Sequence, residues 1–228
     1  MIFDSIVSSR HSTRAYANRP VDQATLEEIL SVAGTAPSSS NIQPWRVYVL
    51  QGQALESLGQ TVSDVYAKCK QDPDLAKQYQ EQFNHYPTNW ISPYIDRRRE
   101  TGKNLYKLLG IPKEDQIGMI QQHQKNYKFF GAPVGLFFTN DGDLGIGSLV
   151  DTGMFIQNIA LAAHARGLGT CVQGCWCRYH SIVLPHIGAK SNETLVCGMA
   201  LGWPDDSDKI NTYHPNRLPL SEFVKWCK

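Results

Sequence analysis

The sequence predicts an α+β protein with a central mixed or antiparallel sheet flanked by helices, in a single domain over residues 1–228. Helical and strand patterns alternate only imperfectly, which argues against a doubly wound parallel sheet. The segment 133–139, PVGLFFT, is continuously apolar, as a strand buried on both faces is. The segment from Leu149 to Gly169 is apolar around most of a helix, which is typical of a helix inside a core.

The first half of the chain carries clear helix signals. Residues 2–9 have the pattern of a short amphipathic helix. Asp22 is a favourable N-cap for a second helix, and Gly34 marks its end. The apolar residues of that helix follow i, i+3, i+4, i+7 spacing: Leu26, Ile29, Leu30 and Ala33. A strand is expected near 45–51, and the following segment ALESLGQTVSDVYAKCK is expected to be helical.

The second half is more broken. Residues 84–93, NHYPTNWISP, interrupt the pattern with two prolines. Helices are expected near 93–109 and near 113–128, and a start of the second one before Glu114 is left open. The glycines of ARGLG end the long apolar helix. A final strand is expected near 193–202.

The C-terminal arm, residues 204–228, combines a polar, proline-punctuated stretch with buried-type residues. These residues are Leu220, Phe223, Val224 and Trp226. An extended arm that carries such side chains needs a surface to lie on. Either the arm's own domain or a second subunit could supply it.

Composition indicates a folded chain that does not depend on net charge to find a partner. The 228 residues are 42% hydrophobic and 19% charged, and the formal net charge is +1. We therefore expect neither nucleic acid nor a membrane as partner. No apolar run is long enough to span a bilayer, and Asp4 stands where a signal peptide needs positive charge, so we expect a cytoplasmic location.

Two motifs are set aside. Cys171, Cys175 and Cys177 form a C-x3-C-x-C cluster, which lacks the paired spacing of common zinc sites. We expect no metal, and reduced thiols packed around a tight turn. The segment GDLGIGSLV lacks the third glycine of a dinucleotide-binding loop and the acidic residue that follows it, so a plain strand-to-helix turn explains it.

Arginines near both ends of the chain are candidate anion ligands. Arg10, Ser12 and Arg14 are spaced i, i+2, i+4 in SRHSTRAY, so they can converge on one anion in an extended or turning segment. Arg217, in HPNRLPL, has a proline two residues away on each side, which restrains its backbone. The alternative for all three arginines is a solvated basic surface.

Two further segments could face a ligand. The loop between Pro37 and Pro44 suits a flat ligand rich in carbonyls and ring nitrogens, and its alternative is a turn whose side chains satisfy their own backbone. Its polar residues are Ser38, Ser39, Asn41 and Gln43. In GLGTCVQGCW, the backbone N–H groups of Gln173 and Gly174 could face a ring nitrogen or an oxyanion, unless this is only a helix end followed by a strand.

Taken together, these segments resemble the FMN-dependent nitroreductase family. The resemblance runs from about residue 8 to residue 225 and rests on SRHSTRAY, APSSSNIQPWRVYVL, DTGMFIQNIALAAHARGLGTCVQG and GMALGWPDD…NRLPL. The P-S-S-x-N-x-Q-P-W block with a distant G-L-G-T-C-x-x-G is specific, whereas R-x-S-x-R alone is not. The middle of the chain looks like the subgroup that acts on nitrobenzoate-like and related nitroaromatics.

The resemblance implies an intertwined homodimer that exchanges its C-terminal arms and binds FMN at the subunit interface. It implies that Arg10, His11 and Ser12 bind the FMN phosphate and ribityl chain. Arg217 should join them at the phosphate, and Arg14 should approach the N1/O2 edge of the ring. The other subunit is expected to contribute Pro37, Ser38, Ser39 and Asn41. One face of the ring should be lined by Val172, Gln173 and Gly174, with backbone N–H groups near N5.

The implied activity is NADH- or NADPH-dependent reduction of a small nitroaromatic or related oxidised aromatic acceptor, by ping-pong hydride transfer through flavin N5. No paired-carboxylate or Ser/His/Asp arrangement is evident, so no catalytic residue is assigned, and His11 is interpreted as a flavin contact rather than a base. Two alternatives stay open. One is a different flavin reaction on the same fold: reductive dehalogenation, flavin cleavage or substrate oxidation. The other is a protein that stores or senses flavin without turnover.

Residues 84–128 are expected to form a helical lid over the open flavin face. Its aromatic residues could stack on an acceptor, or could simply pack: Tyr86, Trp90, Tyr94 and Tyr106. One of Arg97, Arg98 and Arg99 could attract a carboxylate or nitro group. Asn104 is a candidate for the pyrimidine-edge contact that the resemblance leaves unplaced.

Overall fold

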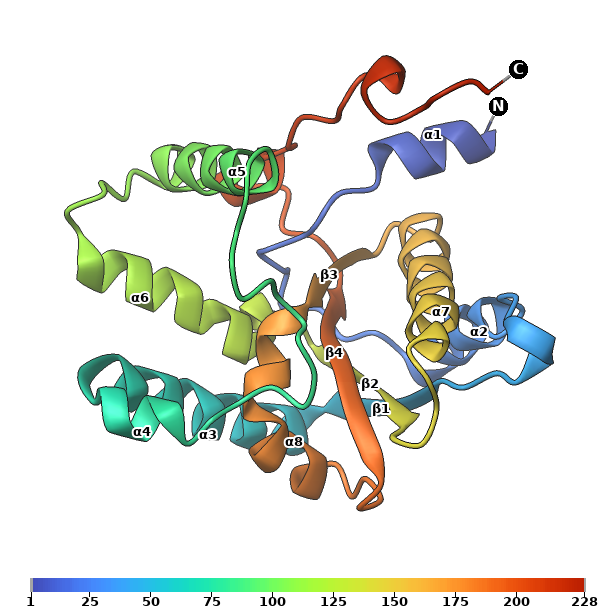
Figure 1. Cartoon of the computed structure of the whole chain (residues 1–228), viewed down its shortest axis with the longest axis horizontal. Coiled ribbons are helices and arrows are strands. Elements are labelled where there is room, and N and C mark those ends of the chain that lie inside the picture. Colours follow the sequence, from blue (N-terminus) through green and yellow to red (C-terminus); the bar gives the residue numbers. More distant parts are fainter. Residues whose placement is uncertain (1, 228) are drawn as a thin grey trace.

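The computed structural model describes residues 2–227 as helices packed against both faces of one sheet (Figure 1). Within these residues the sheet has four strands in the order β1-β2-β4-β3. They are β1 (Arg46–Gln51), β2 (Val134–Asp141), β3 (Gly169–Gln173) and β4 (Glu193–Gly202), and each neighbouring pair is antiparallel. The predicted α+β class is confirmed, with the antiparallel form of the sheet.

The helices divide between the two faces of the sheet. The α-helices of the described chain are α1 (Ile2–Ser9), α2 (Gln23–Ala33), α3 (Gly52–Gln71), α4 (Pro73–Lys77), α5 (Tyr94–Leu109), α6 (Gln116–Gln124), α7 (Gly147–His164) and α8 (His180–His186). Its 3-10 helices are η1 (Ser39–Asn41), η2 (Lys125–Gly131), η3 (Gly174–Tyr179), η4 (Lys209–Thr212) and η5 (Leu220–Glu222). Helices α2 and α7 pack on one face, and α3, α8, η2 and η3 pack on the other.

Strand β2 shows why both faces of the sheet are covered. Its alternate residues belong to different cores, because successive side chains of a strand point to opposite faces. Leu136 and Phe138 pack with α2 and α7, whereas the Phe137 ring lies 5.1 Å from that of Trp176 in η3. The predicted strand at 133–139, buried on both faces, is confirmed.

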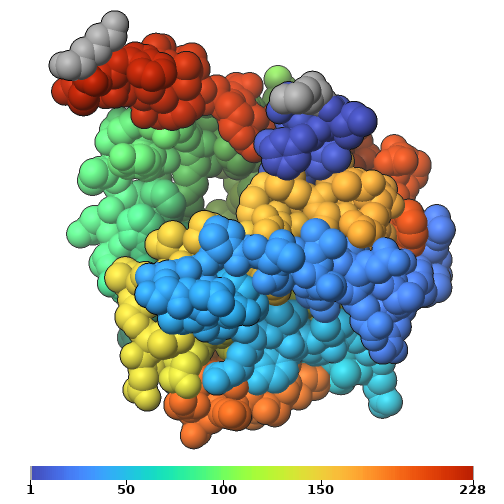
Figure 2. All heavy atoms as spheres, turned by 90° about the vertical axis from the view of Figure 1, so that its right-hand side faces the viewer, coloured from blue at the N-terminus to red at the C-terminus, as the bar shows by residue number. Residues whose placement is uncertain are grey.

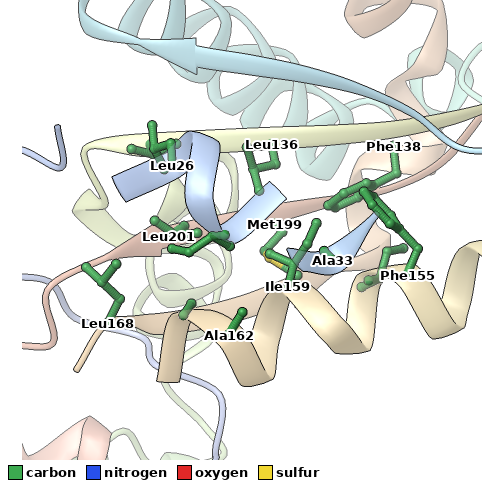
Figure 3. Packing of buried hydrophobic residues seen from close by; sticks show 14 of the residues in the cluster. Leu26, Ala33, Leu136, Phe138, Phe155, Ile159, Ala162, Leu168, Met199 and Leu201 are labelled. Carbon is green, nitrogen blue, oxygen red and sulfur yellow. The ribbon is translucent and has the colours of Figure 1, made fainter. Parts of the chain in front are cut away.

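Helix α7 supplies the centre of the first core, as the apolar pattern predicted. Figure 3 shows Phe155 and Ile159 of α7 beside Ala33 of α2 and Met199 of β4. Ile159 and Met199 have no exposed surface. The Phe155 ring stacks on Trp45 at a centroid distance of 4.8 Å. These contacts fix the helix along its length, and so they also fix the segments that are attached to its two ends.

Some helix signals were correct and others were wrong. The Asp22 carboxylate accepts a hydrogen bond from the Thr25 N–H at 2.8 Å, as expected of an N-cap. Helix α6 does not begin before Glu114, because Asp115 caps it through the Gly118 N–H at 2.8 Å. The helix expected near 113–128 ends at Gln124 and is followed by η2, which contains positive φ angles. The sequence did not predict α4 or α8.

Glu193 is a buried charge that ties three strands together. Its carboxylate accepts hydrogen bonds from the hydroxyls of Tyr48, at 2.9 Å, and Thr139, and from the Lys190 N–H at 3.2 Å. The Arg46 guanidinium lies 3.5 Å away. Burial alone would raise the pKa of Glu193, but these interactions outweigh it and the pKa is lowered. The fold therefore accounts for this carboxylate without a ligand.

The C-terminal arm rests partly on its own chain. Asn211 accepts from the Arg14 N–H at 2.8 Å and donates to the Ala15 carbonyl at 2.8 Å. Further along, the Tyr213 hydroxyl donates to the Thr101 carbonyl of α5 at 3.3 Å. Beyond η4 the arm runs outward to the same side as α1 (Figure 1). The apolar side chains of these two segments stay exposed: Ile2 (84%), Phe3 (64%), Leu220 (58%), Phe223 (64%) and Trp226 (78%).

Truncating a core residue of α7 should destabilise the protein strongly. We expect Ile159→Ala to lower the free energy of unfolding by about 2–5 kcal/mol, because it removes apolar contacts and leaves a cavity. The matched control is Ile117→Ala in α6, a side chain that is 70% exposed. Urea unfolding followed by circular dichroism measures both, and equal effects of the two substitutions would contradict the described core.

Candidate functional site

The segment that follows α1 is fastened to the edge of the sheet. Ser12 forms a parallel bridge with Thr170 of β3, and the Thr13 N–H donates to the Thr170 carbonyl at 2.9 Å. A Cβ on Gly169 would fall 2.2 Å from the Thr13 hydroxyl oxygen, so this close approach requires glycine. Arg10 to Arg14 are therefore held beside β3.

Arg10, Ser12 and Arg14 all interact with the Cys171 thiol of β3. Burial raises the pKa of that thiol, against the opposing influence of Arg14, of a hydrogen bond with Ser12, and of Arg10. The Arg14 guanidinium also donates to the Ser12 carbonyl at 3.3 Å. The structure thus brings together the three residues that the i, i+2, i+4 spacing singled out.

Arg217 reaches the same place from the other end of the chain. The pKa of Arg10 is lowered by burial and then by the charge of Arg217. Arg217 donates only to the carbonyls of Pro215, at 2.9 Å, and Asn216, at 3.3 Å. Within residues 2–227 no carboxylate pairs with either guanidinium. Two neighbouring positive charges without a counter-ion form a site suited to an anion such as phosphate.

Three histidines lie near Arg10. The rings of His11 and His214 lie 4.3 Å apart. At the end of α7, His164 Nε2 lies 2.8 Å from the Ser9 hydroxyl. Burial, and then His11 and Arg10, lower the pKa of His164. The sequence interpretation included His11 but missed His164 and His214, although His214 stands only three residues before Arg217.

The polar loop at 37–43 is also held firmly, but at the other end of α7. The Ser39 N–H donates to the Asp151 carboxylate at 3.2 Å, and the Ser38 hydroxyl accepts from the Gln43 N–H at 3.0 Å. Ser40, Asn41 and Gln43 have φ angles of 48°, 57° and 46°. Such angles are costly for residues other than glycine and tend to occur where function requires them. The side chains of Pro37, Ser39 and Asn41 are exposed.

Helix α7 separates this loop from the arginines. The loop is attached at Asp151, and the arginine segment lies near His164, at the end of α7. Thirteen residues of α-helix span about 20 Å. A single chain therefore does not bring the two predicted halves of the site together.

The third predicted segment, Val172 to Gly174, lies at the edge strand β3. Val172 is 49% exposed, whereas Gln173 is buried, with its side-chain amide donating to the Asn126 carbonyl at 2.6 Å. Only the backbone of Gln173 is left to face a ligand there. His85 packs on Gly174, where a Cβ would fall 2.0 Å from His85 Nε2. Sequence reasoning did not single out His85.

The region predicted as a lid forms a pocket of about 420 Å³ next to η3. It includes Tyr86, Trp90 and Arg98, and the Arg98 guanidinium lies 4.8 Å from the Trp90 ring centroid. The other lining residues are Tyr66, Cys69, Lys70, Ala76, Glu81, His123, Tyr127, Cys175, Arg178 and Tyr179. The pocket is aromatic and carries more cations than carboxylates, which suits an aromatic anion.

Other lid residues do not line this pocket. Arg97 lies over Tyr94 at 5.2 Å, and Arg99 lies 4.0 Å from the Asp96 carboxylate. Tyr106 is partly buried, which raises its pKa. Asn104 lines a smaller cavity with Arg217 under the C-terminal arm. Figure 2 shows open space between α5 and α7, beneath that arm.

The described residues contain neither a metal-binding cluster nor a membrane-spanning helix. Within 2–227, no group of three or more His, Cys, Asp or Glu side chains is arranged to hold a metal ion. Burial raises the pKa of Cys175 and of Cys177, the latter to about 12, so both are protonated thiols near neutral pH. Among the described helices, none has the length and apolarity that crossing a bilayer requires.

Known proteins are similar to this chain in sequence and in fold. The model of the nitroreductase family matches residues 7–203. A 4-nitrobenzoate reductase of Nocardioides sp. is 36% identical over 97% of this chain and 88% of its own length. A chloronitrobenzene nitroreductase of Comamonas testosteroni is 35% identical over 97% and 95%.

A solved structure agrees with these sequence matches. It is the FMN- and NADPH-dependent nitroreductase NfnB of Sphigopyxis sp. strain HMH, which superposes with a TM-score of 0.91 at 33% identity, over 99% of both chains. The match of the family model over most of the chain, together with relatives above 30% identity, identifies this chain as a member of the nitroreductase family.

Proposed function

We propose that this protein is an FMN-dependent oxidoreductase that uses NADPH or NADH to reduce small nitroaromatic compounds, as a homodimer in the cytoplasm. The observation that carries the proposal is the approach of Arg10 and Arg217 without a carboxylate partner. The relatives named above support the chemistry, since they are nitroaromatic reductases and an FMN- and NADPH-dependent enzyme. A cytoplasmic location agrees with cysteines that are all free in the described chain.

The residues present fit FMN. Arg10, Ser12 and Arg217 would hold its phosphate, with His11 at the ribityl chain. Arg14 would place a positive charge at the N1/O2 edge of the ring, where it stabilises negative charge on the reduced flavin. The exposed edge of β3 would line one ring face through Val172 and the backbone of Gln173 and Gly174.

A second subunit would complete the site. The loop with Pro37, Ser38, Ser39 and Asn41 lies about 20 Å along α7 from the arginines, so it would serve the flavin bound mainly by the partner. The dimer would also cover exposed apolar side chains. Those near the start of α7, on α1 and on the arm are Ile146 (85%), Val150 (66%), Ile2, Phe3, Phe223 and Trp226. The part of the arm beyond Arg217 would then be exchanged between the subunits.

The protein's share of the chemistry is binding and orientation. Bound FMN would supply two-electron transfer from the nicotinamide to the acceptor, in ping-pong order through N5. The residues proposed to bind FMN include no paired carboxylates. The pocket lined by Tyr86, Trp90 and Arg98 would receive the acceptor, with rings to stack on and cations for a carboxylate or nitro group.

Anaerobic stopped-flow spectroscopy tests this proposal. The purified protein should be yellow, NADPH should bleach the flavin absorbance, and 4-nitrobenzoate should restore it. Bleaching without recovery would favour dehalogenation, flavin cleavage or another flavin reaction. A flavin that neither NADPH nor NADH bleaches would favour a protein that stores or senses flavin.

The lid arginines should differ in their effect on acceptor choice. We expect Arg98→Ala to raise KM for 4-nitrobenzoate about two- to fivefold relative to neutral nitrobenzene, as for the loss of one partly exposed charge pair. Arg99→Ala is the matched control, because Arg99 interacts with Asp96 and does not line the pocket. If both variants left the ratio of the two KM values unchanged, Arg98 would have no part in binding the carboxylate.

A further inference from the structure

An imidazole cluster stands beside the candidate phosphate site, and hydrogen bonds with the hydroxyl and the carbonyl of Ser9 hold two of its rings in place. It consists of His11, His164 and His214, which come from the N-terminal segment, the end of α7 and the C-terminal arm. A cavity of about 460 Å³ lies among the three rings. Its polar lining also includes Thr13, Asn211 and Thr212.

The charges around this cluster are mainly positive. Arg10 is close enough to His164 to lower its pKa, and Arg217 is close to Arg10. Asp206 is the one carboxylate among the residues described as lining the cavity. The Cys171 thiol is protonated, because burial raises its pKa. A proton added to an imidazole here meets repulsion, unless an anion is present to compensate it.

We propose that His164 and His214 form a second, proton-linked layer of the FMN phosphate site, behind Arg10, His11 and Arg217. While the site is empty, neutral imidazoles add no further positive charge beside the two guanidinium groups. A bound phosphate dianion makes protonation of the same rings favourable, so binding takes up protons. The inference rests on the proposed function, because it takes the anion to be the flavin phosphate.

The sign of the effect follows from linkage. A group that binds its proton more tightly in the complex strengthens binding as the pH falls through its pKa. Each histidine whose pKa rises by one unit on phosphate binding tightens FMN binding by up to about tenfold as the pH falls below both of its pKa values. Protonation of the phosphate acts in the opposite direction. Its second pKa is about 6, so it carries less negative charge at lower pH.

Fluorescence titration of the flavin-free protein with FMN tests the inference, with Kd measured from about pH 6.3 to about pH 8.3. We expect FMN to bind about fivefold or more tightly at the lower pH. Riboflavin, which lacks the phosphate, should show a change of less than about twofold over the same range. Calorimetry in buffers of different ionisation enthalpy should record proton uptake with FMN only.

The double variant His164→Asn/His214→Asn should flatten the FMN profile to within about twofold, chiefly by weakening binding at the lower pH. His186→Asn is the matched control, because His186 lies in α8 with its ring nitrogen 3.0 Å from the Ala54 carbonyl, and it should keep the wild-type profile. FMN binding with no pH dependence, or a dependence kept in the double variant, would overturn this inference alone. No binding of either flavin would overturn the proposed function and this inference together.

Discussion

The proposed site depends on two like charges that the fold holds close together. Arg10 and Arg217 come from opposite ends of the chain, and neither has a carboxylate partner in the described residues. Like charges separate unless something fixes them or an anion compensates them. Here the bridge between Ser12 and Thr170 fixes the N-terminal segment to the sheet, and the hydrogen bonds of Asn211 fix the arm to that segment. Holding the two guanidinium groups together costs folding free energy, and a bound anion would offset that cost.

The rigidity of α7 decides how the rest of the site can be built. Ile159 and its neighbours bury this helix between α2 and the sheet, so its two ends cannot approach each other. The strained loop is attached at Asp151, and the arginine segment lies near His164. A flavin that uses both must therefore lie between two chains. The apolar side chains exposed on α1 and on the arm are consistent with the same arrangement.

The sequence predicted elements that carry local signals and missed those set by tertiary contacts. The Asp22 cap and the apolar patterns of α7 and β2 are local, and these elements formed as predicted. For the short strand β3, which pairs with β4, the sequence offered a strand only as an alternative interpretation. Helices α4 and α8 were missed because they are too short for a periodic pattern.

The candidate site divides in the same way. Arg10, Ser12 and Arg14 were singled out by their spacing, and in the fold all three interact with Cys171, while Arg217 lies close to Arg10. His164 and His214 lie far apart in the sequence, so only the fold brings them beside Arg10.

We propose that each flavin site uses the arginines of one chain and the loop of the other. Co-expression of Arg10→Ala/Arg217→Ala with Ser39→Ala/Asn41→Gly, followed by purification of mixed dimers and measurement of bound FMN, tests it most directly. The account predicts that each variant alone loses FMN and that mixed dimers regain about half of the sites, because one site then combines two intact halves. Mixed dimers that bind no more FMN than the separate variants would contradict it.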